Sequence, residues 1–238
     1  MLQQTQVERV VPRYARFLRR FPSLRALARA PLAEVLIEWD GLGYPRRARD
    51  LHRAARAVRR LPREPDGLDA LPGVGRYTAG AVACFAFGDP VAFADTNIRR
   101  VLGRVLLGRT ATEREATALD AALLPRAAAA RWHHALMDLG ATVCTARAPR
   151  CDACPVRDLC LAKGREPEPP GRRRATPFAS SDRRVRGLIL RALRDAPAGL
   201  PVAALSRMVG DERVARLASD LEREGLVESA DGRTGLPR

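Results

Sequence analysis

Long apolar segments are absent from this sequence, which contains no run of about 18 apolar residues, the length that a membrane-spanning helix needs. Met1 is followed by polar Gln and Thr residues rather than by the apolar core of a secretion signal. The alternation of apolar and polar residues typical of a β-strand is missing until the last few dozen residues. We therefore expect a cytoplasmic protein without membrane contact, and an all-α fold.

Acidic residues are few compared with basic ones. The 238 residues include 27 Asp and Glu against 42 Lys and Arg, which gives a formal net charge of +15 and a pI near 11.2. Basic residues in such excess repel one another, so they indicate a polyanionic partner, with nucleic acid as the first candidate. The alternative is a GC-rich genome that places Arg and Ala at many positions. Hydrophobic residues, at 46%, suffice for one or two cores, and we expect a monomer.

Apolar residues recur at three- and four-residue spacing through most of the chain, which predicts helices. The first begins near Val7, almost at the start of the sequence, and Pro12 is expected to kink it. Further helices are predicted at residues 31–39, 46–60, 75–87, 97–107, 113–124, 128–139, 183–194, 202–208 and 212–224.

The composition changes at residues 163–180, KGREPEPPGRRRATPFAS, where proline and like charges disfavour a packed element. This stretch predicts a linker, placed at residues 166–180. Beyond it, three helices lead into a hairpin expected around Asp231 and Gly232. Residues 181–238 therefore predict a small winged-helix-like module, and a plain helical cap without DNA contact is the alternative.

Four of the five cysteines are clustered. Cys144, Cys151, Cys154 and Cys160 are spaced C-x6-C-x2-C-x5-C, while Cys84 stands alone in an apolar helix. Clustered cysteines in a cytoplasmic protein indicate a metal site rather than disulfides. Four thiolates can hold either a structural zinc ion or an iron–sulfur cluster, and the spacing leaves both open.

A glycine-containing turn precedes the helix predicted from Gly75. In Leu71-Pro72-Gly73-Val74-Gly75 the glycines permit positive φ and close approach of another backbone. Backbone N–H groups at such a helix start can bind a phosphate, although an ordinary helix–helix turn is the alternative. A second stretch, VAFADTNIRRVLGR, places Asp95 directly before a helix, where an N-capping role is expected.

Three features follow one another along the chain: the stretch LPGVGRYTAG, the aspartate of DTNIRRVLGR and the cysteine frame. In this order they resemble the helix-hairpin-helix DNA glycosylases that carry a 4Fe-4S cluster. Three further stretches are MLQQTQV, GLGYPRRARDLH and MDLGATVC. They narrow the resemblance to the adenine DNA glycosylase family, over residues 1 to about 165. The resemblance implies a helical barrel domain with the helix-hairpin-helix (residues 1–94), a 4Fe-4S cluster domain (residues 95–165) and a location on the bacterial nucleoid.

The family resemblance implies a function and a set of site residues. Members excise adenine mispaired with 8-oxoguanine or guanine in double-stranded DNA, by flipping the adenosine into a pocket. Asp95 matches the catalytic carboxylate that stabilises the sugar cation, and Tyr77 and Asn97 match residues that line the pocket. The implied ligands of the cluster are Cys144, Cys151, Cys154 and Cys160. The implied DNA contacts are Leu2, Gln3, Gln4, Thr5, Tyr44, Arg46, Leu71, Gly73, Val74, Gly75 and Arg76.

The residue at position 77 separates two related activities. In endonuclease III relatives a lysine stands there and attacks the sugar, which leads to strand cleavage. Tyr77 cannot form that Schiff base, so a monofunctional glycosylase is implied. A thymine-mismatch glycosylase of the same superfamily also fits Tyr77.

The sequence departs from the family pattern in three places. Family members carry a glutamate, the general acid, two residues before the methionine of MLQQTQ, and the sequence begins at that methionine. We expect that the start codon is misassigned and that Met1 is an internal residue of a longer protein. The alternative is a true truncation, which would leave a protein with impaired excision or with DNA binding alone. Pro45 replaces a tyrosine that wedges beside 8-oxoguanine, and residues 181–238 do not resemble the usual Nudix-like domain.

Remaining basic residues are given general roles. The groups Arg46-Arg47-Arg49 and Arg99-Arg100 are predicted to contact DNA phosphates, with a solvated helix face as the alternative. His133 and His134 have no partner at metal-ligand spacing, so we expect them to face solvent or DNA.

Overall fold

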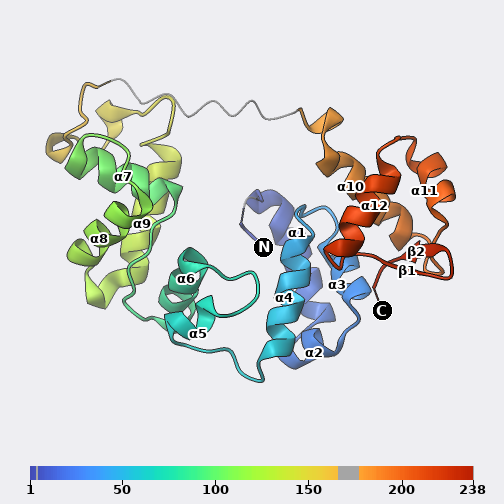
Figure 1. Ribbon diagram of the computed structural model, residues 1–238. Helices are drawn as coiled ribbons and strands as arrows, with labels where there is room; N and C mark the ends of the chain where they lie inside the picture. The colour runs from blue at the N-terminus through green and yellow to red at the C-terminus, as the bar shows by residue number, and fades with distance from the viewer. Residues whose placement is uncertain (4, 166–176, 238) are drawn as a thin grey trace. The chain divides into compact units, whose positions relative to one another are not determined.

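The computed structural model describes residues 1–3, 5–165 and 177–237, so most of the predicted linker lies outside the described residues. The described chain forms two compact units (Figure 1). The first combines residues 1–60 with the residues that follow the predicted linker, and the second begins at Leu61. Each unit is described by itself below.

Four helices form the N-terminal part of the first unit: α1 Val7–Arg20, α2 Leu24–Arg29, α3 Leu32–Trp39 and α4 Arg46–Ala57. Helix α1 continues through Pro12, and Phe17 on its buried face meets the rings of Phe21 and Trp39 edge to face. Ser23 caps α2 by accepting a hydrogen bond from the backbone N–H of Ala26 over 3.1 Å. A side-chain cap therefore begins α2, whereas α1, α3 and α4 begin without one.

The C-terminal part of the first unit consists of η4 Phe178–Ser180, α10 Asp182–Arg194, α11 Val202–Val209, α12 Val214–Arg223, β1 Glu228–Ala230 and β2 Arg233–Gly235. The two strands pair antiparallel, with Ala230 opposite Arg233. Asp231 and Gly232 between them have φ values of 51° and 70°, as a two-residue type I′ turn requires. The predicted hairpin is confirmed at these two residues.

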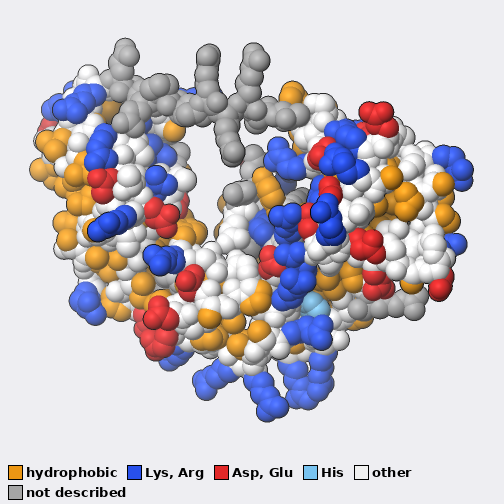
Figure 2. Space-filling model, in the orientation of Figure 1, with side chains coloured by type: hydrophobic (Ala, Val, Ile, Leu, Met, Phe, Trp, Pro, Cys, Tyr) orange, Lys and Arg blue, Asp and Glu red, His pale blue; other side chains and the backbone are white. Residues whose placement is uncertain are grey.

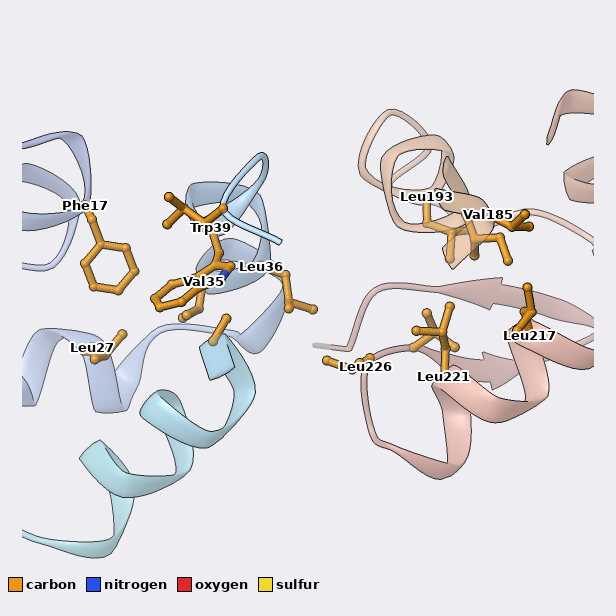
Figure 3. Close-up of a cluster of buried hydrophobic side chains, with 14 of the residues drawn as sticks. Phe17, Leu27, Val35, Leu36, Trp39, Val185, Leu193, Leu217, Leu221 and Leu226 are labelled. Carbon is orange, nitrogen blue, oxygen red and sulfur yellow. The ribbon is translucent and has the colours of Figure 1, made fainter. Parts of the chain in front are cut away.

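The two parts of the first unit share one apolar core. Figure 3 shows Phe17 and Trp39 from the N-terminal helices together with Leu193 and Leu221 from the C-terminal ones, all members of the same buried cluster. The backbone N–H of Ala33 also donates to the carbonyl of Pro237 over 2.9 Å. The module after the linker is thus built into the first unit, which the sequence did not predict.

The second unit contains α5 Pro65–Asp69, α6 Arg76–Phe87, α7 Thr96–Leu107, α8 Glu113–Leu123, η1 Arg126–Ala128, α9 Ala129–Thr142, η2 Cys151–Ala153 and η3 Arg157–Leu159. Thr112 and Glu115 form a capping box that starts α8. Gly103 lets α7 approach the loop after it, because an added Cβ would lie 2.2 Å from the backbone nitrogen of Ala111. The core gathers Phe93, Ile98, Val101 and Leu136 with smaller side chains.

The all-α prediction is confirmed, and the predicted long helices are present with ends shifted by a few residues. Helices α2 and α5 were not predicted, because six and five residues are too few to show a helical period. The domain boundary predicted after residue 94 falls inside the second unit, immediately before α7. Among the described residues, no helix is long and apolar enough to cross a membrane.

Candidate functional site

The predicted hairpin joins α5 to α6. Gly73 has φ +73°, the left-handed conformation that favours glycine, and the N–H of Val74 closes the turn on the carbonyl of Leu71 over 3.1 Å. Gly75 is the N-cap of α6 with φ −114°, so its conformation does not require glycine. A Cβ on Gly75 would meet nothing within 4 Å, and no side chain caps α6. The helix start is therefore accessible to a close backbone or phosphate group.

Asp95 is the N-cap of α7, as the sequence predicted. Its Oδ1 accepts the backbone N–H groups of Asn97 (2.8 Å) and Ile98 (2.7 Å), and its Oδ2 accepts the side-chain amide of Asn97 over 2.9 Å. Three donors hold this half-buried carboxylate in a fixed orientation. The structure therefore brings the predicted residues Asp95 and Asn97 together.

Tyr77 lies on the first turn of α6 and belongs to the same site. Its ring meets that of Phe93 edge to face at 5.7 Å between centroids. Burial, and next the negative charge of Asp95, raise the pKa of the Tyr77 hydroxyl. The hydroxyl thus keeps its proton and can donate a hydrogen bond beside the carboxylate.

Arg100 connects this site to the first cysteine of the frame. Its Nη2 donates to Asn97 Oδ1 over 2.7 Å and to the carbonyl of Gly140 over 2.6 Å, while its Nε donates to the carbonyl of Cys144 over 2.6 Å. An added Cβ on Gly140 would lie 2.6 Å from the Cβ of Asn97, so α9 approaches α7 closely here. The sequence predicted a phosphate contact for Arg100, and the structure gives its guanidinium this internal role instead.

The four clustered cysteines line one cavity of about 290 Å³ in the second unit. Arg104, to which the sequence assigned no role, donates to the Sγ of Cys144 over 3.5 Å and to the carbonyls of Thr145 and Ala146. Nowhere among the described residues do three His, Cys, Asp or Glu side chains lie as a single metal ion requires. Four thiols around one cavity of this volume fit a 4Fe-4S cluster, which takes one thiolate at each of its four irons.

The start of the chain is fastened to the loop before α4. Arg47 is the centre of this contact, and its guanidinium donates to oxygens of Met1, Gln3, Thr5, Leu42 and Gly43. Its guanidinium also lies over the rings of Trp39 and Tyr44, at 5.4 and 5.3 Å from their centroids. Arg47 was predicted to contact phosphate, but it is directed inward. Leu2 remains exposed, and Gln4 lies outside the described residues.

Tyr44 and Arg46 contact the C-terminal part of the first unit. Tyr44 has φ +50°, unusual for a non-glycine residue, and its hydroxyl lies 3.2 Å from Arg183 Nη1. Arg46 donates to Glu224 Oε2 over 2.7 Å, and Arg186 pairs with the same carboxylate. Figure 2 shows the basic side chains along α4 with acidic ones among them. Part of the predicted basic DNA surface is therefore neutralised by the protein itself.

His133 differs most from its predicted place. It is fully buried in α9 and hydrogen-bonds Asp120 of α8, whereas solvent or DNA contact was expected. His134 is exposed and stacks on Phe85. Nothing in the sequence marked Asp120 as a partner, because the two residues belong to different helices. By contrast, Arg100 follows Asn97 by three residues, a helical spacing that could have revealed their contact.

Comparison with known proteins gives two matching family models. Residues 1–126 match the HhH-GPD superfamily base excision DNA repair protein, and residues 144–160 match the iron-sulfur binding domain of endonuclease III. The second range begins and ends at cysteines of the frame. The chain accordingly carries a 4Fe-4S cluster as its cofactor.

Individual proteins are similar over most of the chain. Adenine DNA glycosylase of Mycolicibacterium smegmatis is 44% identical over 250 residues, 99% of this chain and 84% of that protein. The structure of a thermostable thymine-DNA glycosylase is 29% identical with a TM-score of 0.60, covering 68% of this chain and 79% of that one. A trapped endonuclease III–DNA covalent intermediate is 28% identical with a TM-score of 0.61, covering 67% of this chain and 78% of that one.

Proposed function

This chain belongs to the adenine DNA glycosylase family of the HhH-GPD superfamily of base excision DNA repair proteins, and we propose that it removes adenine mispaired with 8-oxoguanine or guanine. It is a DNA-binding base-excision repair glycosylase. The observation that carries the proposed excision is the site around Asp95: a carboxylate held by three donors, with the protonated hydroxyl of Tyr77 beside it. The choice of adenine rests on the similarity to adenine DNA glycosylase.

Excision breaks the bond between the sugar C1′ and the adenine nitrogen. The bond electrons leave with adenine, which takes up a proton, and the sugar becomes an oxocarbenium-like cation. We assign to Asp95 the electrostatic stabilisation of that cation until water adds to C1′ and loses a proton. Asn97 fixes the orientation of the carboxylate, because its side-chain amide donates to Asp95 Oδ2 over 2.9 Å. Tyr77 is assigned to the wall of the adenine pocket.

DNA binding is divided between elements of both units. The start of α6, with Gly73, Val74, Gly75 and Arg76 after Leu71, is assigned to a backbone phosphate. The exposed Leu2, with its neighbours Gln3, Gln4 and Thr5, is assigned to the base stack opposite the flipped adenine. Tyr44 and Arg46 are assigned to the DNA beside that segment.

The cluster is assigned a structural part. Its ligands would be Cys144, Cys151, Cys154 and Cys160. When bound, the cluster would cross-link the loop after α9 and fix its conformation. The chain's own contribution is the hydrogen bond from Arg100 to the carbonyl of Cys144, which joins that loop to Asn97. Loss of the loop would therefore disturb a neighbour of Asp95.

The proton donor for adenine is the remaining part of the proposal. Family members carry a glutamate two residues before the methionine that matches Met1, and we propose that a glutamate at that place protonates the leaving base. Glu34 and Glu38 are not assigned as the proton donor, because they form ion pairs with Arg20 and Arg16 on the surface of the first unit. Reading the in-frame codons upstream of Met1 would establish whether the glutamate is encoded.

The test is single-turnover base excision by the cluster-loaded protein, on duplexes that hold adenine opposite 8-oxoguanine, guanine or thymine. The printed 238 residues are compared with the same residues preceded by a glutamate at the expected place. We expect excision from the first two duplexes by the chain with the glutamate, and no strand cleavage. Release of thymine from a G:T duplex instead would make this a thymine-mismatch glycosylase. Binding without excision by either chain would make it a non-catalytic iron–sulfur DNA-binding protein.

A further inference from the structure

Asp120 is a fully buried carboxylate in the core of the second unit. It accepts three N–H groups: the backbone N–H of Phe93 (3.0 Å), the indole Nε1 of Trp132 (2.7 Å) and the ring Nε2 of His133 (2.8 Å). A carboxylate in such a place needs this set, because an unsatisfied buried charge is very costly. Helices α8 and α9 and the segment before α7 meet at this one side chain.

His133 extends the network to α6. It is fully buried as well, and its Nδ1 lies 3.5 Å from the Sγ of Cys84. Burial raises the pKa of the Cys84 thiol, so the thiol keeps its proton and can donate to Nδ1 while Nε2–H donates to Asp120. Cysteine, histidine and aspartate in this order resemble a nucleophilic triad, but all three are buried, so no substrate reaches the sulfur.

Phe93 is the residue that this network holds in place. Asp120 fixes its backbone N–H, and the His133 ring stacks on its ring, with centroids 3.9 Å apart and an interplanar angle of 21°. Gly80 of α6 also approaches so closely that an added Cβ would lie 2.8 Å from the Phe93 Cβ. Main chain and side chain of Phe93 are therefore both fixed.

The position of Phe93 determines that of the catalytic site, because Asp95 follows it by two residues and Tyr77 packs on its ring. Apolar side chains of similar size could fill the same core without the desolvation cost of a buried carboxylate and imidazole. Stability alone therefore does not explain this pair, whereas an exact position for Phe93 does.

We propose that Asp120 and His133 are positioning residues, which act through Phe93 to set where the Asp95 carboxylate stands relative to the sugar. The inference rests on the proposed function, since it assigns a role in the same site. Loss of either side chain lets the segment before α7 shift, and a shift of an ångström weakens the interaction with the sugar cation. DNA affinity as such is unaffected, because neither buried residue can touch DNA.

The test uses binding rather than excision, so it does not depend on the proton donor. One duplex carries a cationic pyrrolidine in place of the deoxyribose opposite 8-oxoguanine, and a second carries a neutral tetrahydrofuran there. The ratio of the two Kd values measures how well a carboxylate meets the sugar cation. We expect the unvaried protein to prefer the cation by about tenfold or more, and Asp95→Asn to remove that preference.

Asp120→Asn and His133→Leu are expected to lower the preference about fivefold or more, with the Kd for the neutral duplex unchanged within about twofold. His133→Gln keeps an N–H for Asp120, so it should restore most of the preference for the cationic duplex that His133→Leu loses. In the Asp95→Asn protein, adding Asp120→Asn should change nothing further. Leu136→Ala, which truncates another buried side chain of α9, controls for lost stability and should keep the preference; melting temperatures are measured for all variants.

An unchanged ratio in Asp120→Asn or in His133→Leu would overturn the inference, as would an equal loss in Leu136→Ala. If Asp120→Asn does not fold, the pair His133→Leu and His133→Gln decides. An unvaried protein without preference for the cation would overturn it too, because Asp95 would then not stand where the cation forms. Adenine excision on the same preparations decides the proposed function separately, so the two failures are distinguishable.

Discussion

Asp95 Oδ1 accepts the backbone N–H of Ile98 over 2.7 Å, so the carboxylate assigned to the sugar cation is also the one that begins helix α7. Capping therefore uses Oδ1 of the same carboxylate that is assigned to catalysis. The helix orients the carboxylate, and the two roles can be separated by substitution.

Asp95→Asn should remove the catalytic role and keep the capping role. Asparagine is as good an N-cap as aspartate, so the free energy of unfolding should change by only about 0.5 kcal/mol, whereas Asp95→Ala should lose about 1 kcal/mol. Excision should fall about 100-fold or more in both, because both lack the charge that stabilises the cation. Urea unfolding and single-turnover excision measure the two effects. Equal excision by Asp95→Asn and the unvaried protein would refute the assignment.

Two glycines of the hairpin should respond differently to alanine. Gly75→Ala should leave stability unchanged, since its φ is −114° and nothing lies within 4 Å of the new Cβ. It should weaken duplex binding about tenfold, because the methyl group stands where a phosphate approaches the helix start. Gly73→Ala should instead cost about 1 kcal/mol of stability, because φ there is +73°. Full duplex affinity in Gly75→Ala would place the phosphate elsewhere.

Two cysteines give a matched pair for the cluster. Cys154→Ala should abolish the iron and sulfide content and the visible absorbance, because it removes one of the four ligands. Cys84→Ala should keep both, since Cys84 is buried in α6 away from the cavity that the other four line. Iron and acid-labile sulfide assays on the purified variants measure this. Iron retained in Cys154→Ala at the unvaried level would contradict the assigned ligand set.

The ion pairs between α4 and the C-terminal part of the first unit should stabilise the fold less as the pH falls. The hydrogen bond from Arg46, and next that from Arg186, lower the pKa of Glu224 from its ordinary 4.5 to about 2. A folded-state pKa below the unfolded one means that Glu224 stabilises the fold above about pH 4.5 and loses this contribution as the pH falls toward 2. Glu224→Gln should therefore cost about 1–2 kcal/mol at pH 7 and much less near pH 3.

Urea unfolding at the two pH values, followed by circular dichroism, checks this difference. Glu212→Gln, an exposed carboxylate of the same part of the chain, is the control and should change stability little at either pH. An equal cost of Glu224→Gln at pH 7 and pH 3 would show that the ion pairs contribute nothing.

The sequence predicted those features that depend on neighbours in the chain. The hairpin at Asp231 and Gly232, the capping role of Asp95 and most helices follow from local spacing and are confirmed. The iron–sulfur cofactor needed the resemblance to known proteins, because spacing alone allowed zinc. Gly73 has the predicted positive φ, whereas Gly75 does not.

The sequence did not predict contacts that depend on packing between distant helices. The pair of Asp120 and His133 joins two helices, and no periodicity marks such a contact in advance. Arg47 and Arg100 look like surface cations in a basic chain, but the fold turns both toward protein oxygens. The core shared by the N-terminal helices and the residues after the linker was missed for the same reason.

Single-turnover excision of adenine opposite 8-oxoguanine tests the central claim most directly, with the cluster loaded and a glutamate at the expected place ahead of Met1. The account predicts release of adenine, an uncut strand and a loss of about 100-fold or more in Asp95→Asn. Binding of the duplex without release of adenine, or release that does not depend on Asp95, would contradict it.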